Sequence, residues 1–358
     1  MTPVQIPFVA SRRSDEDAAR LAFLSGARTA YLVLDRAVAS RARAVAGALA
    51  VAGIDVLGKT AMAGGERSKK MRSVEKIHAD LVAAGADRAT LVVAVGGGTV
   101  TDVAGFAAAT YMRGVPWLPV ATTVLGMVDA AIGGKTGVDM PEGKNLVGAF
   151  WQPVGVVADL TALGSLPVRE RRTGMAEIVK HAIVGDAGLL GVCETFDSGS
   201  SGADWPSLIR RAAEVKLRIV RRDERETGVR ASLNLGHTIG HGIEQAKRFR
   251  LSHGAAVAVG LRAAGLLALR RGMWNTKAHA RVLCALAQAG LTVHVERLSA
   301  SETIAAMRHD KKRTNGTHRF VLPLRLGTVA VGIDVSEPEI RRVLAICGRP
   351  APVSERTG

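Results

Sequence analysis

The segment ATLVVAVGGG, residues 89–98, defines the architecture expected for this chain. Its apolar run carries no polar residue between Leu91 and Val95, which is typical of a strand buried on both faces of a sheet. The glycines that follow let the backbone turn sharply, and residues 100–112 are predicted to form a helix. The segment therefore predicts a buried strand, a tight turn and a helix, which is the repeating unit of a parallel α/β sheet.

The sequence on both sides of this segment repeats the alternation of strands and helices. Strands are predicted over residues 29–35, 54–58, 115–123 and 154–160, and helices over residues 37–53 and 68–84. Val- and Leu-rich strands separated by helices or long crossovers form parallel sheets covered on both faces, with ligands at the carboxyl ends of the strands. Residues 1–160 are therefore predicted to form an α/β nucleotide-binding domain with a Rossmann-like parallel sheet.

The glycine turn itself has two interpretations. Gly96, Gly97 and Gly98 could let a pyrophosphate contact the backbone at the helix N-terminus, where the helix dipole attracts anions. The spacing departs from the dinucleotide-binding pattern G-x-G-x-x-G, and tight turns between strand and helix also contain glycine for steric reasons alone. Asp102, expected in the first turn of the helix, could contact a ligand or merely complement the dipole. The residues alone leave both interpretations open.

A second segment, TTVLGMVDAAIGGKTGVDMPEGKN at residues 122–145, carries charged and amide side chains among glycine and proline breakers. It is too irregular for one long helix and too polar for a buried strand. Its Asp129, Lys135, Lys144 and Asn145 suit a small anionic ligand, because ammonium groups bind phosphate or carboxylate and glycine lets the main chain approach closely. A solvated loop is the alternative.

After residue 160 the pattern changes to helices. They are predicted over residues 165–186, 204–222, 228–247, 253–271, 276–289 and 337–346, with one hairpin at residues 318–331. Residues 348–358 are expected to form a frayed tail. The second domain, residues 161–358, is therefore predicted to be mainly α-helical.

The helical half also contains a set of residues suited to a metal. Glu177 and Lys180 share one helix face, His237 and His241 share another at a spacing of four, and His253 follows a loop later. One carboxylate with two or three histidines on packed helices is a good donor set for Zn²⁺ that leaves a position open for water or substrate. The alternative is that each histidine separately is a hydrogen-bonded core or capping residue.

Composition and charge narrow the class of protein. The chain has 358 residues and 47% hydrophobic content, enough for a large core over two domains. Its formal charge of +16 suggests nucleic acid, but the 48 Lys and Arg are scattered and aromatic residues make up 4%, so an acidic small substrate explains the excess equally well. Three cysteines at unrelated spacings indicate core thiols in a reducing compartment. Without a long apolar run, we expect a cytoplasmic protein with neither a membrane nor a nucleic-acid partner.

Several segments together closely resemble the 3-dehydroquinate synthase family of sugar-phosphate cyclases. They occur in family order from about residue 65 to residue 327, and they are GGGTVTDVAGFAAATYMRG, ATTVLGMVDAAIGGKTGVDMPEGKNLVGAFWQP, GMAEIVKHAIV, RASLNLGHTIGHGIE, SHGAAVAVG and HDKKR. The resemblance implies an N-terminal nucleotide-binding α/β domain and a C-terminal α-helical metal- and substrate-binding domain. It also implies bound NAD, a divalent metal (Zn²⁺ or Co²⁺) and a homodimer.

The reaction implied by the resemblance is a lyase step of the shikimate pathway of aromatic amino-acid biosynthesis. The substrate would be 3-deoxy-arabino-heptulosonate 7-phosphate, a phosphorylated sugar acid, and the products 3-dehydroquinate and phosphate. NAD⁺ would remove hydride from the C5 hydroxyl, phosphate would leave by β-elimination, and NADH would return the hydride. Ring opening and an intramolecular aldol step would then close the carbocycle.

The resemblance also implies a role for particular residues. The metal ligands would be Glu177, His237 and His253. The NAD contacts would be Asp35, Glu66, Lys69, Gly97, Gly98, Asp102, Thr122, Thr123, Asp129, Lys144 and Ser165. The catalytic and substrate contacts would be Arg113, Asp129, Lys135, Asn145, Lys180, Lys216, Glu226, Arg230, Asn234, His241 and Lys311. Arg113 would reach the site of the neighbouring subunit.

Three positions depart from the family pattern. Ala255 stands where the family usually has glutamate, so support for the third metal ligand is expected to be altered. Thr101 replaces the glycine before the nucleotide-binding aspartate, and Arg36-Ala37 lacks a usual asparagine. These departures concern the surroundings of the cofactor and metal more than the substrate residues.

Other functions remain open on the sequence. A second sugar-phosphate cyclase, forming aminodehydroquinate or a valiolone, would use the same chemistry, although Lys135, Lys144, Asn145, Arg230 and Asn234 favour a carboxylated substrate. A non-catalytic or nucleic-acid-binding descendant would fit the charge and Ala255. An iron- or zinc-dependent polyol dehydrogenase would share the glycine turn and a helical metal domain, and net accumulation of NADH would distinguish it.

Overall fold

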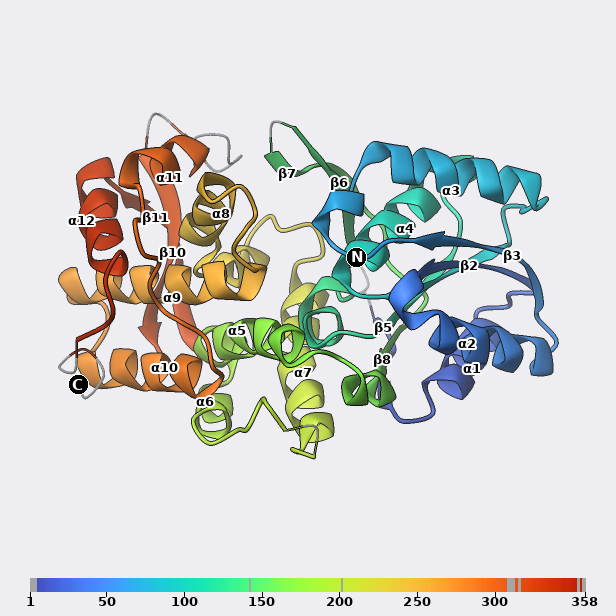
Figure 1. Ribbon diagram of the computed structural model, residues 1–358, viewed down its shortest axis with the longest axis horizontal. Coiled ribbons are helices and arrows are strands. Elements are labelled where there is room, and N and C mark those ends of the chain that lie inside the picture. The colour runs from blue at the N-terminus through green and yellow to red at the C-terminus, as the bar shows by residue number, and fades with distance from the viewer. Residues whose placement is uncertain are drawn as a thin grey trace. The chain divides into compact units, whose positions relative to one another are not determined.

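The computed structural model describes residues 5–141, 143–200, 202–307, 313–314, 317–352 and 355 (Figure 1). The chain forms two compact units. The first comprises Met1–Pro167 and Trp205–Ala213, and the second comprises Val168–Asp204 and Glu214–Gly358. In the described part of the chain, no helix has both the length and the apolar character needed to cross a bilayer.

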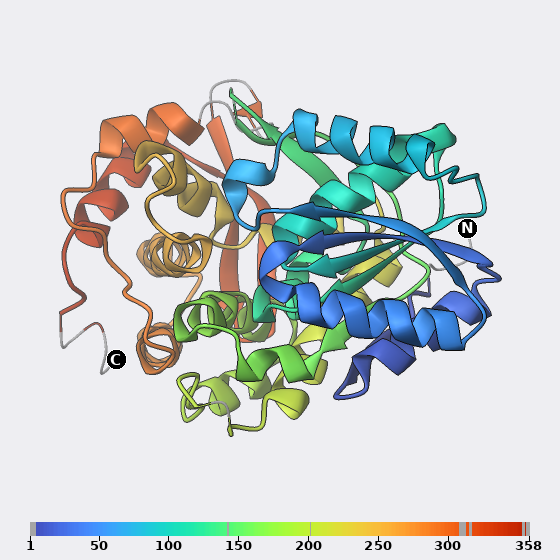
Figure 2. The same cartoon turned by 45° about the vertical axis from the view of Figure 1, so that its right-hand side comes forward.

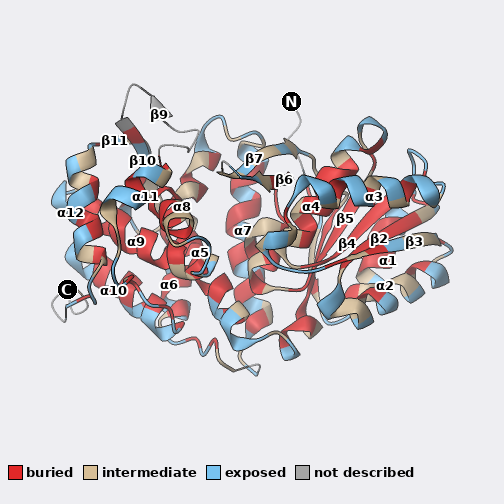
Figure 3. Ribbon diagram, turned by 45° about the horizontal axis from the view of Figure 1, so that its top comes forward, coloured by how far each residue is buried: buried red, intermediate tan, exposed pale blue. Residues whose placement is uncertain are grey.

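The first unit is built on a parallel sheet, as predicted. Over the described residues the sheet has six strands in the order β1-β8-β5-β4-β2-β3, and each strand is parallel to its neighbours. The strands are β1 (Phe8–Ser11), β2 (Thr29–Asp35), β3 (Asp55–Met62), β4 (Leu91–Gly96), β5 (Trp117–Ala121) and β8 (Val156–Asp159). All residues of β4 and β5 are buried, which is the reason for their uninterrupted apolar sequence (Figure 3).

Helices cover both faces of this sheet (Figure 2). The helices α3 (Met71–Ala83) and α4 (Gly98–Thr110) pack with Val92 and Ala94 of β4, whereas α1 (Ser14–Leu24) and α2 (Ala39–Val51) pack with Val93 and Val95. Successive residues of a strand point to opposite faces, so one strand supplies both cores. β1 and α1 were not predicted from the sequence, and β1 extends the sheet by pairing with β8.

The strand order reverses next to β2. From β2 the chain passes outward to the edge strand β3, and then returns to form β4 on the other side of β2. Such a reversal separates the loops that follow the two central strands and creates the usual position for a ligand in an α/β sheet. Asp35 at the end of β2 and Gly97 after β4 flank this point.

The segment at residues 122–145 is a short π-helical turn followed by a strand that is buried only in its middle, which agrees with the expectation that it is neither one long helix nor a fully buried strand. The turn is Gly126–Ala130, and β6 (Lys135–Met140) pairs antiparallel with β7 (Gly143–Phe150). The hairpin packs one face against α4, where Thr136 lies against Gly105. Only alternate residues of such a strand need to be apolar, so its sequence lacks the continuous apolar run that is typical of a buried strand.

The second unit consists of helices around α9, with a small antiparallel sheet. The helices are α5 (Val168–Gly185), α6 (Ala187–Cys193), α7 (Trp205–Arg222, which begins in the first unit), α8 (His237–Ala246), α9 (His253–Arg270), α10 (Thr276–Gln288), α11 (Ala300–Met307) and α12 (Glu337–Cys347). The strands are β9 (Arg313–Thr314), β10 (Thr317–Arg325) and β11 (Thr328–Val335). The predicted hairpin is confirmed, while α6 and α11 were not predicted.

Two further expectations for the second unit are wrong. The helix predicted over residues 228–247 is divided into a 3₁₀ segment, Val229–Asn234, and α8, because Gly236 between them has φ of +77°. The tail is not wholly frayed, since Nε and Nη2 of the buried Arg262 guanidinium each donate to one carboxylate oxygen of Glu355 at 2.7 Å. Buried charge pairing of this kind fixes the tail to α9.

Candidate metal centre and nucleotide-binding edge

Close backbone contacts bring α5 and α9 together. A Cβ atom added to Gly254, at the start of α9, would lie 2.3 Å from the carbonyl oxygen of Thr173 in α5. No side chain fits in that space, so the two helices touch through their backbones. Thr173 and Glu177 are one turn apart on α5, and Gly254 adjoins His253. The contact therefore places Glu177 beside His253.

A similar contact brings α8 onto α9. A Cβ atom on Gly260 would lie 1.9 Å from the carbonyl oxygen of Gly236, the residue that precedes His237 and α8. Gly260 and His253 are seven residues apart and share one face of α9. The start of α8 is thereby placed against the face that carries His253.

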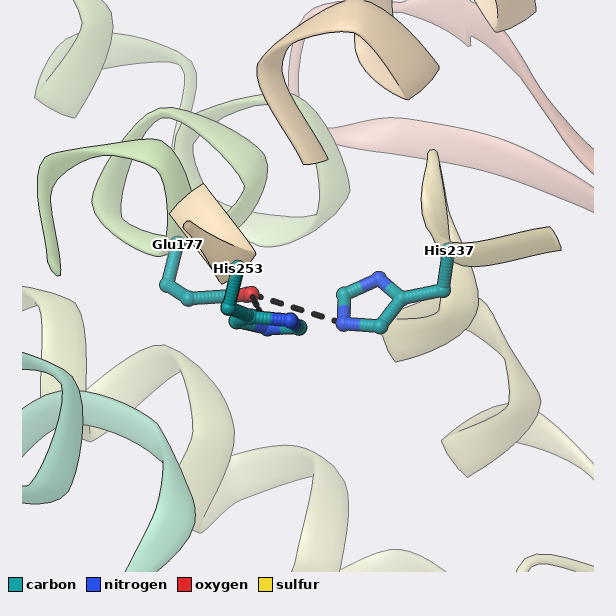
Figure 4. Close-up of side chains that lie close together, drawn as sticks. All are labelled: Glu177, His237 and His253. Carbon is teal, nitrogen blue, oxygen red and sulfur yellow. Dashed lines mark hydrogen bonds and ion pairs between the residues drawn. The ribbon is translucent and has the colours of Figure 1, made fainter. Parts of the chain in front are cut away.

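Three predicted metal ligands meet where these helices converge (Figure 4). The Nε2 atom of His253 lies 3.1 Å from Oε1 of Glu177, and the Nε2 atom of His237 lies 3.4 Å from the same oxygen. One donor atom from each residue lies within 4.8 Å of the others. Zinc bonds of about 2.0–2.2 Å in tetrahedral geometry would separate ligand atoms by about 3.3 Å. The donor set and its spacing fit a tetrahedral metal.

The ring orientation of His237 suits a metal ligand. Its Nδ1 atom lies 3.1 Å from the carbonyl oxygen of Leu235, which can only accept a hydrogen bond. Nδ1 therefore carries the proton and leaves the Nε2 lone pair directed at the Glu177 side of the cluster. A backbone carbonyl on the far nitrogen is a common partner of a metal-bound histidine.

The electrostatics of the cluster favour a cation at its centre. Burial opposes ionisation of Glu177, but Lys180 and His237 hold its pKa well below the usual value. Burial also opposes charge on His253, but hydrogen bonds to Glu177 and Glu244 raise its pKa to about 10. Burial lowers the pKa of His237. The protonated His253 therefore carries N–H groups on both ring nitrogens, and a divalent cation would replace the proton on Nε2, which faces Glu177.

The other predicted site residues of the second unit are mostly buried or held by hydrogen bonds. Lys180, Lys216 and Arg230 are buried, and Lys180 pairs with Glu177. The Nδ2 atom of Asn234 donates to Oε1 of Glu226, and the His241 ring makes an edge contact with His237 at a centroid distance of 5.2 Å. Lys311 lies outside the described residues.

The predicted NAD contacts of the first unit gather at the carboxyl edge of its sheet. Asp35 ends β2, Gly97 and Gly98 follow β4, and Thr122 follows β5, hydrogen-bonded through its N–H to the Gly96 carbonyl at 2.9 Å. Sterics alone account for part of the glycine run, since a Cβ on Gly96 would lie 2.8 Å from Cβ of Val100. The steric interpretation of the glycine turn is therefore confirmed at Gly96, and the pyrophosphate interpretation stays a prediction.

Ion pairs link several of these predicted contacts. The Nζ atom of Lys69 lies 2.6 Å from both Asp102 Oδ2 and Asn145 Oδ1, and Lys144 lies 2.7 Å from Glu66. Burial would lower the pKa of Lys69, but Asp102 and Glu66 raise it above the usual value. The Lys69 ammonium is therefore charged, and it joins Asp102, a predicted NAD contact, to Asn145, a predicted substrate contact. Asp102 lies beyond the first turn of α4, so its predicted place in that turn is wrong.

The remaining predicted residues of the first unit are more exposed. Lys135 at the start of β6 and Ser165 after Leu160–Gly164 are exposed, and Asp129 in the π-helical turn is partly buried. Arg113 is exposed and has φ of +69°, a left-handed conformation that a non-glycine residue rarely adopts. Such a conformation is common at binding sites.

Sequence reasoning missed two acidic residues. Glu244 lies at the far nitrogen of His253, with Oε2 3.5 Å from Nδ1. Asp139 accepts the Asn145 backbone N–H at 2.9 Å, and burial together with Glu66 raises its pKa to about 6 against the opposing effect of Lys69. The seven-residue spacing from His237 was the one available signal for Glu244, since it places both on one face of a helix.

Comparison with known proteins supports one family over most of the chain. The N-terminal model of 3-dehydroquinate synthase matches residues 59–173 and the C-terminal model matches residues 174–313. The 3-dehydroquinate synthase of Gloeobacter violaceus is 43% identical over 300 residues, which cover 83% of each chain.

Two solved structures of sugar cyclases share the fold over nearly the whole chain. One is ValA, a 2-epi-5-epi-valiolone synthase from Streptomyces hygroscopicus with NAD⁺ and Zn²⁺ bound, which has a TM-score of 0.86 and 28% identity over 97% of this chain and 98% of that chain. The other is a 2-deoxy-scyllo-inosose synthase complexed with carbaglucose-6-phosphate, NAD⁺ and Co²⁺, with a TM-score of 0.85 and 25% identity over 96% and 99%. The matched models and the extent of identity show that this chain belongs to the 3-dehydroquinate synthase family.

Proposed function

We propose that this chain is a 3-dehydroquinate synthase, which converts 3-deoxy-arabino-heptulosonate 7-phosphate to 3-dehydroquinate and phosphate. The observation that carries the proposal is the convergence of Glu177, His237 and His253 within 4.8 Å in a chain that is 43% identical to a 3-dehydroquinate synthase over 83% of its length. The enzyme class is a phosphate-eliminating lyase. A cytoplasmic location and a homodimer are part of the same proposal.

The proposed cofactors are NAD and a divalent metal, Zn²⁺ or Co²⁺. Glu177, His237 and His253 would hold the metal, and the residues at the carboxyl edge of the parallel sheet would hold NAD. When bound, NAD would accept and return a hydride, and the metal would lower the pKa of a substrate hydroxyl. The two cyclase structures described above contain the same combination of NAD⁺ with Zn²⁺ or Co²⁺, which supports the assignment.

Buried cations of the second unit would bind the acidic substrate. Lys180 and Lys216 carry ammonium groups that attract anions, and the Arg230 guanidinium can form two parallel hydrogen bonds to a carboxylate. All three are at most 7% exposed, so their charges act in a medium less polar than water. Asp223 fixes the loop before Arg230 by accepting the backbone N–H groups of Thr227, Gly228 and Arg230. A carboxylated sugar phosphate suits this arrangement.

The test is to incubate purified protein with NAD⁺, Zn²⁺ or Co²⁺ and the heptulosonate phosphate, and to follow phosphate release and the carbocyclic product. The expected result is stoichiometric phosphate and 3-dehydroquinate without net NADH. Product that forms only from an amino-substituted substrate would assign the chain to the aminodehydroquinate branch. Accumulating NADH with no phosphate release would contradict the proposal and indicate a dehydrogenase.

A further inference from the structure

The imidazole of His253 lies between two carboxylates. Its Nε2 atom is 3.1 Å from Oε1 of Glu177, and its Nδ1 atom is 3.5 Å from Oε2 of Glu244. Glu244 is only 2% exposed, in the last turn of α8. A buried carboxylate is costly to leave in such a place without a charged or hydrogen-bonding neighbour. The ring of His253 is therefore oriented from both sides.

Helix geometry explains why Glu244 can reach this ring. His237 and Glu244 are seven residues apart, so they lie on the same face of α8. The face of α8 that carries the predicted ligand His237 therefore also carries the Glu244 carboxylate. That carboxylate faces the other predicted ligand, His253, at the N-terminus of α9. The contact between Gly236 and Gly260 that holds α8 on α9 thus sets both distances.

The alanine at position 255 acts elsewhere. Ser252 caps α9 and its Oγ accepts the Ala255 backbone N–H at 3.4 Å. Position 255 is the third residue of the helix, where a glutamate would return to the N-cap backbone and complete a capping box. The absence of a glutamate at position 255 therefore affects the N-terminal cap of α9. The sequence predicts altered support for the third metal ligand, and in the structure the carboxylate beside His253 is that of Glu244.

We propose that Glu244 is a positioning residue for the metal site, a role that rests on the metal assignment in the proposed function. It accepts a hydrogen bond from Nδ1–H of His253, which fixes the tautomer, leaves the Nε2 lone pair for the metal, and raises the basicity of the ring. In this role the carboxylate orients His253 and is not itself a metal ligand. Its effect appears in how tightly the metal is held.

The experiment measures metal retention directly. Wild-type, Glu244→Gln, Glu244→Ala and the control Glu194→Gln are loaded with Co²⁺ or Zn²⁺, and metal transfer to a chelator is timed. Glu194 is a carboxylate of the same unit that pairs with Arg281 and has no contact with the cluster. Loss of the carboxylate that pairs with His253 is expected to speed metal release about 10–100-fold, and more for Glu244→Ala than for Glu244→Gln. The control variant is expected to release metal at the wild-type rate. The visible spectrum of bound Co²⁺ is expected to shift in the two Glu244 variants only.

A second variant separates metal support from folding. Ala255→Glu is expected to raise the melting temperature by completing the capping box, while the rate of metal release stays at the wild-type value. Glu244 variants that retain metal as the wild type does would overturn the proposal, as would slower metal release in Ala255→Glu.

The stoichiometry of bound metal distinguishes the remaining outcomes. One donor atom each from His241, Glu244 and His253 also lies within 4.8 Å, so Glu244 could itself be a ligand. Wild-type protein that holds two metals and loses one in Glu244→Gln would overturn the positioning role. Wild-type protein that holds no metal at all would contradict the proposed metal site, and with it this role. A single metal, released faster in the variants, supports both.

Discussion

The metal cluster and the nucleotide-binding edge are held in place by different means. In the second unit, Glu177 is fully buried and its neighbours are set by backbone contacts between helices, such as that of Gly254 with Thr173. In the first unit, the candidate residues sit where parallel strands end, and they are linked by ion pairs such as that of Lys69 with Asp102. The position of the metal cluster depends on helix packing, whereas the position of the nucleotide-binding residues follows from sheet topology. Substitutions should therefore affect the two sites in different ways.

The largest effect is expected from Gly260→Ala. The added Cβ would lie 1.9 Å from the Gly236 carbonyl oxygen, so α8 must move away from α9 and separate His237 from His253. We expect a loss of about 3 kcal/mol or more in unfolding free energy, and loss of bound metal. Chemical denaturation and metal analysis measure both.

A matched glycine provides the control for this change. Gly47 lies in α2 of the first unit, is exposed, and would have no heavy atom within 4 Å of an added Cβ. Gly47→Ala is expected to be neutral or to stabilise the helix by up to about 1 kcal/mol. If Gly260→Ala behaved like Gly47→Ala, close packing of α8 on α9 would not be what fixes the cluster.

The next effect is expected from Glu177→Ala. Oε1 of its carboxylate lies near both His237 and His253, and Oε2 pairs with Lys180. Its removal is expected to abolish metal binding and turnover together, while NAD binding, assigned to the other unit, is retained. Metal analysis, phosphate release and NAD titration check the three quantities. A variant that is metal-free but fully active would contradict the ligand assignment.

A third prediction concerns the buried charge pair that holds the tail. Burial alone would raise the pKa of Glu355, but hydrogen bonds from Arg262 and His279 lower it to about 2, against an ordinary value of 4.5. A carboxyl whose folded pKa is depressed contributes stability above its unfolded pKa and loses it as pH falls through the folded value. The contribution, at most about 3 kcal/mol, is therefore complete above pH 4.5 and lost between pH 4.5 and about 2.

The substitution Glu355→Gln tests this pH dependence. It is expected to lower stability at neutral pH, because a buried guanidinium loses its charged partner, and to flatten the stability curve in the acid range. Denaturant unfolding at several pH values measures both effects. Equal acid sensitivity in wild type and variant would show that other carboxyls cause the acid loss. Metal retention at neutral pH is expected to stay unchanged, since Glu355 is not a donor in the cluster.

The sequence predicted the sheet better than it predicted the sites. The apolar run at residues 91–95 is sufficient to place β4, because a strand buried on both faces requires it. The spacing of His237 and His241 placed both on one helix face, but nothing local showed that α8 would end with Glu244 against His253. That meeting depends on a contact between helices, Gly236 with Gly260, which has no periodic signal. The hairpin at residues 135–150 escaped because its glycines and charges resemble a loop.

The smallest of these effects is expected at the strand-end site, from Lys69→Met. The substitution keeps the length of the side chain but removes the ammonium that lies 2.6 Å from both Asp102 and Asn145. Because Lys69 is 5% exposed, Asp102 loses the ammonium at 2.6 Å in a poorly solvated position. We expect weaker NAD binding and a higher KM for the phosphorylated substrate, each about 10-fold, with metal content unchanged.

Lys76→Met is the control, because Lys76 is 62% exposed and pairs with Asp80 on the surface of α3. Fluorescence titration with NAD and steady-state kinetics check the two quantities. If NAD affinity fell while KM stayed constant, Lys69 would hold Asp102 alone, and Asn145 would owe its position to its backbone hydrogen bond with Asp139.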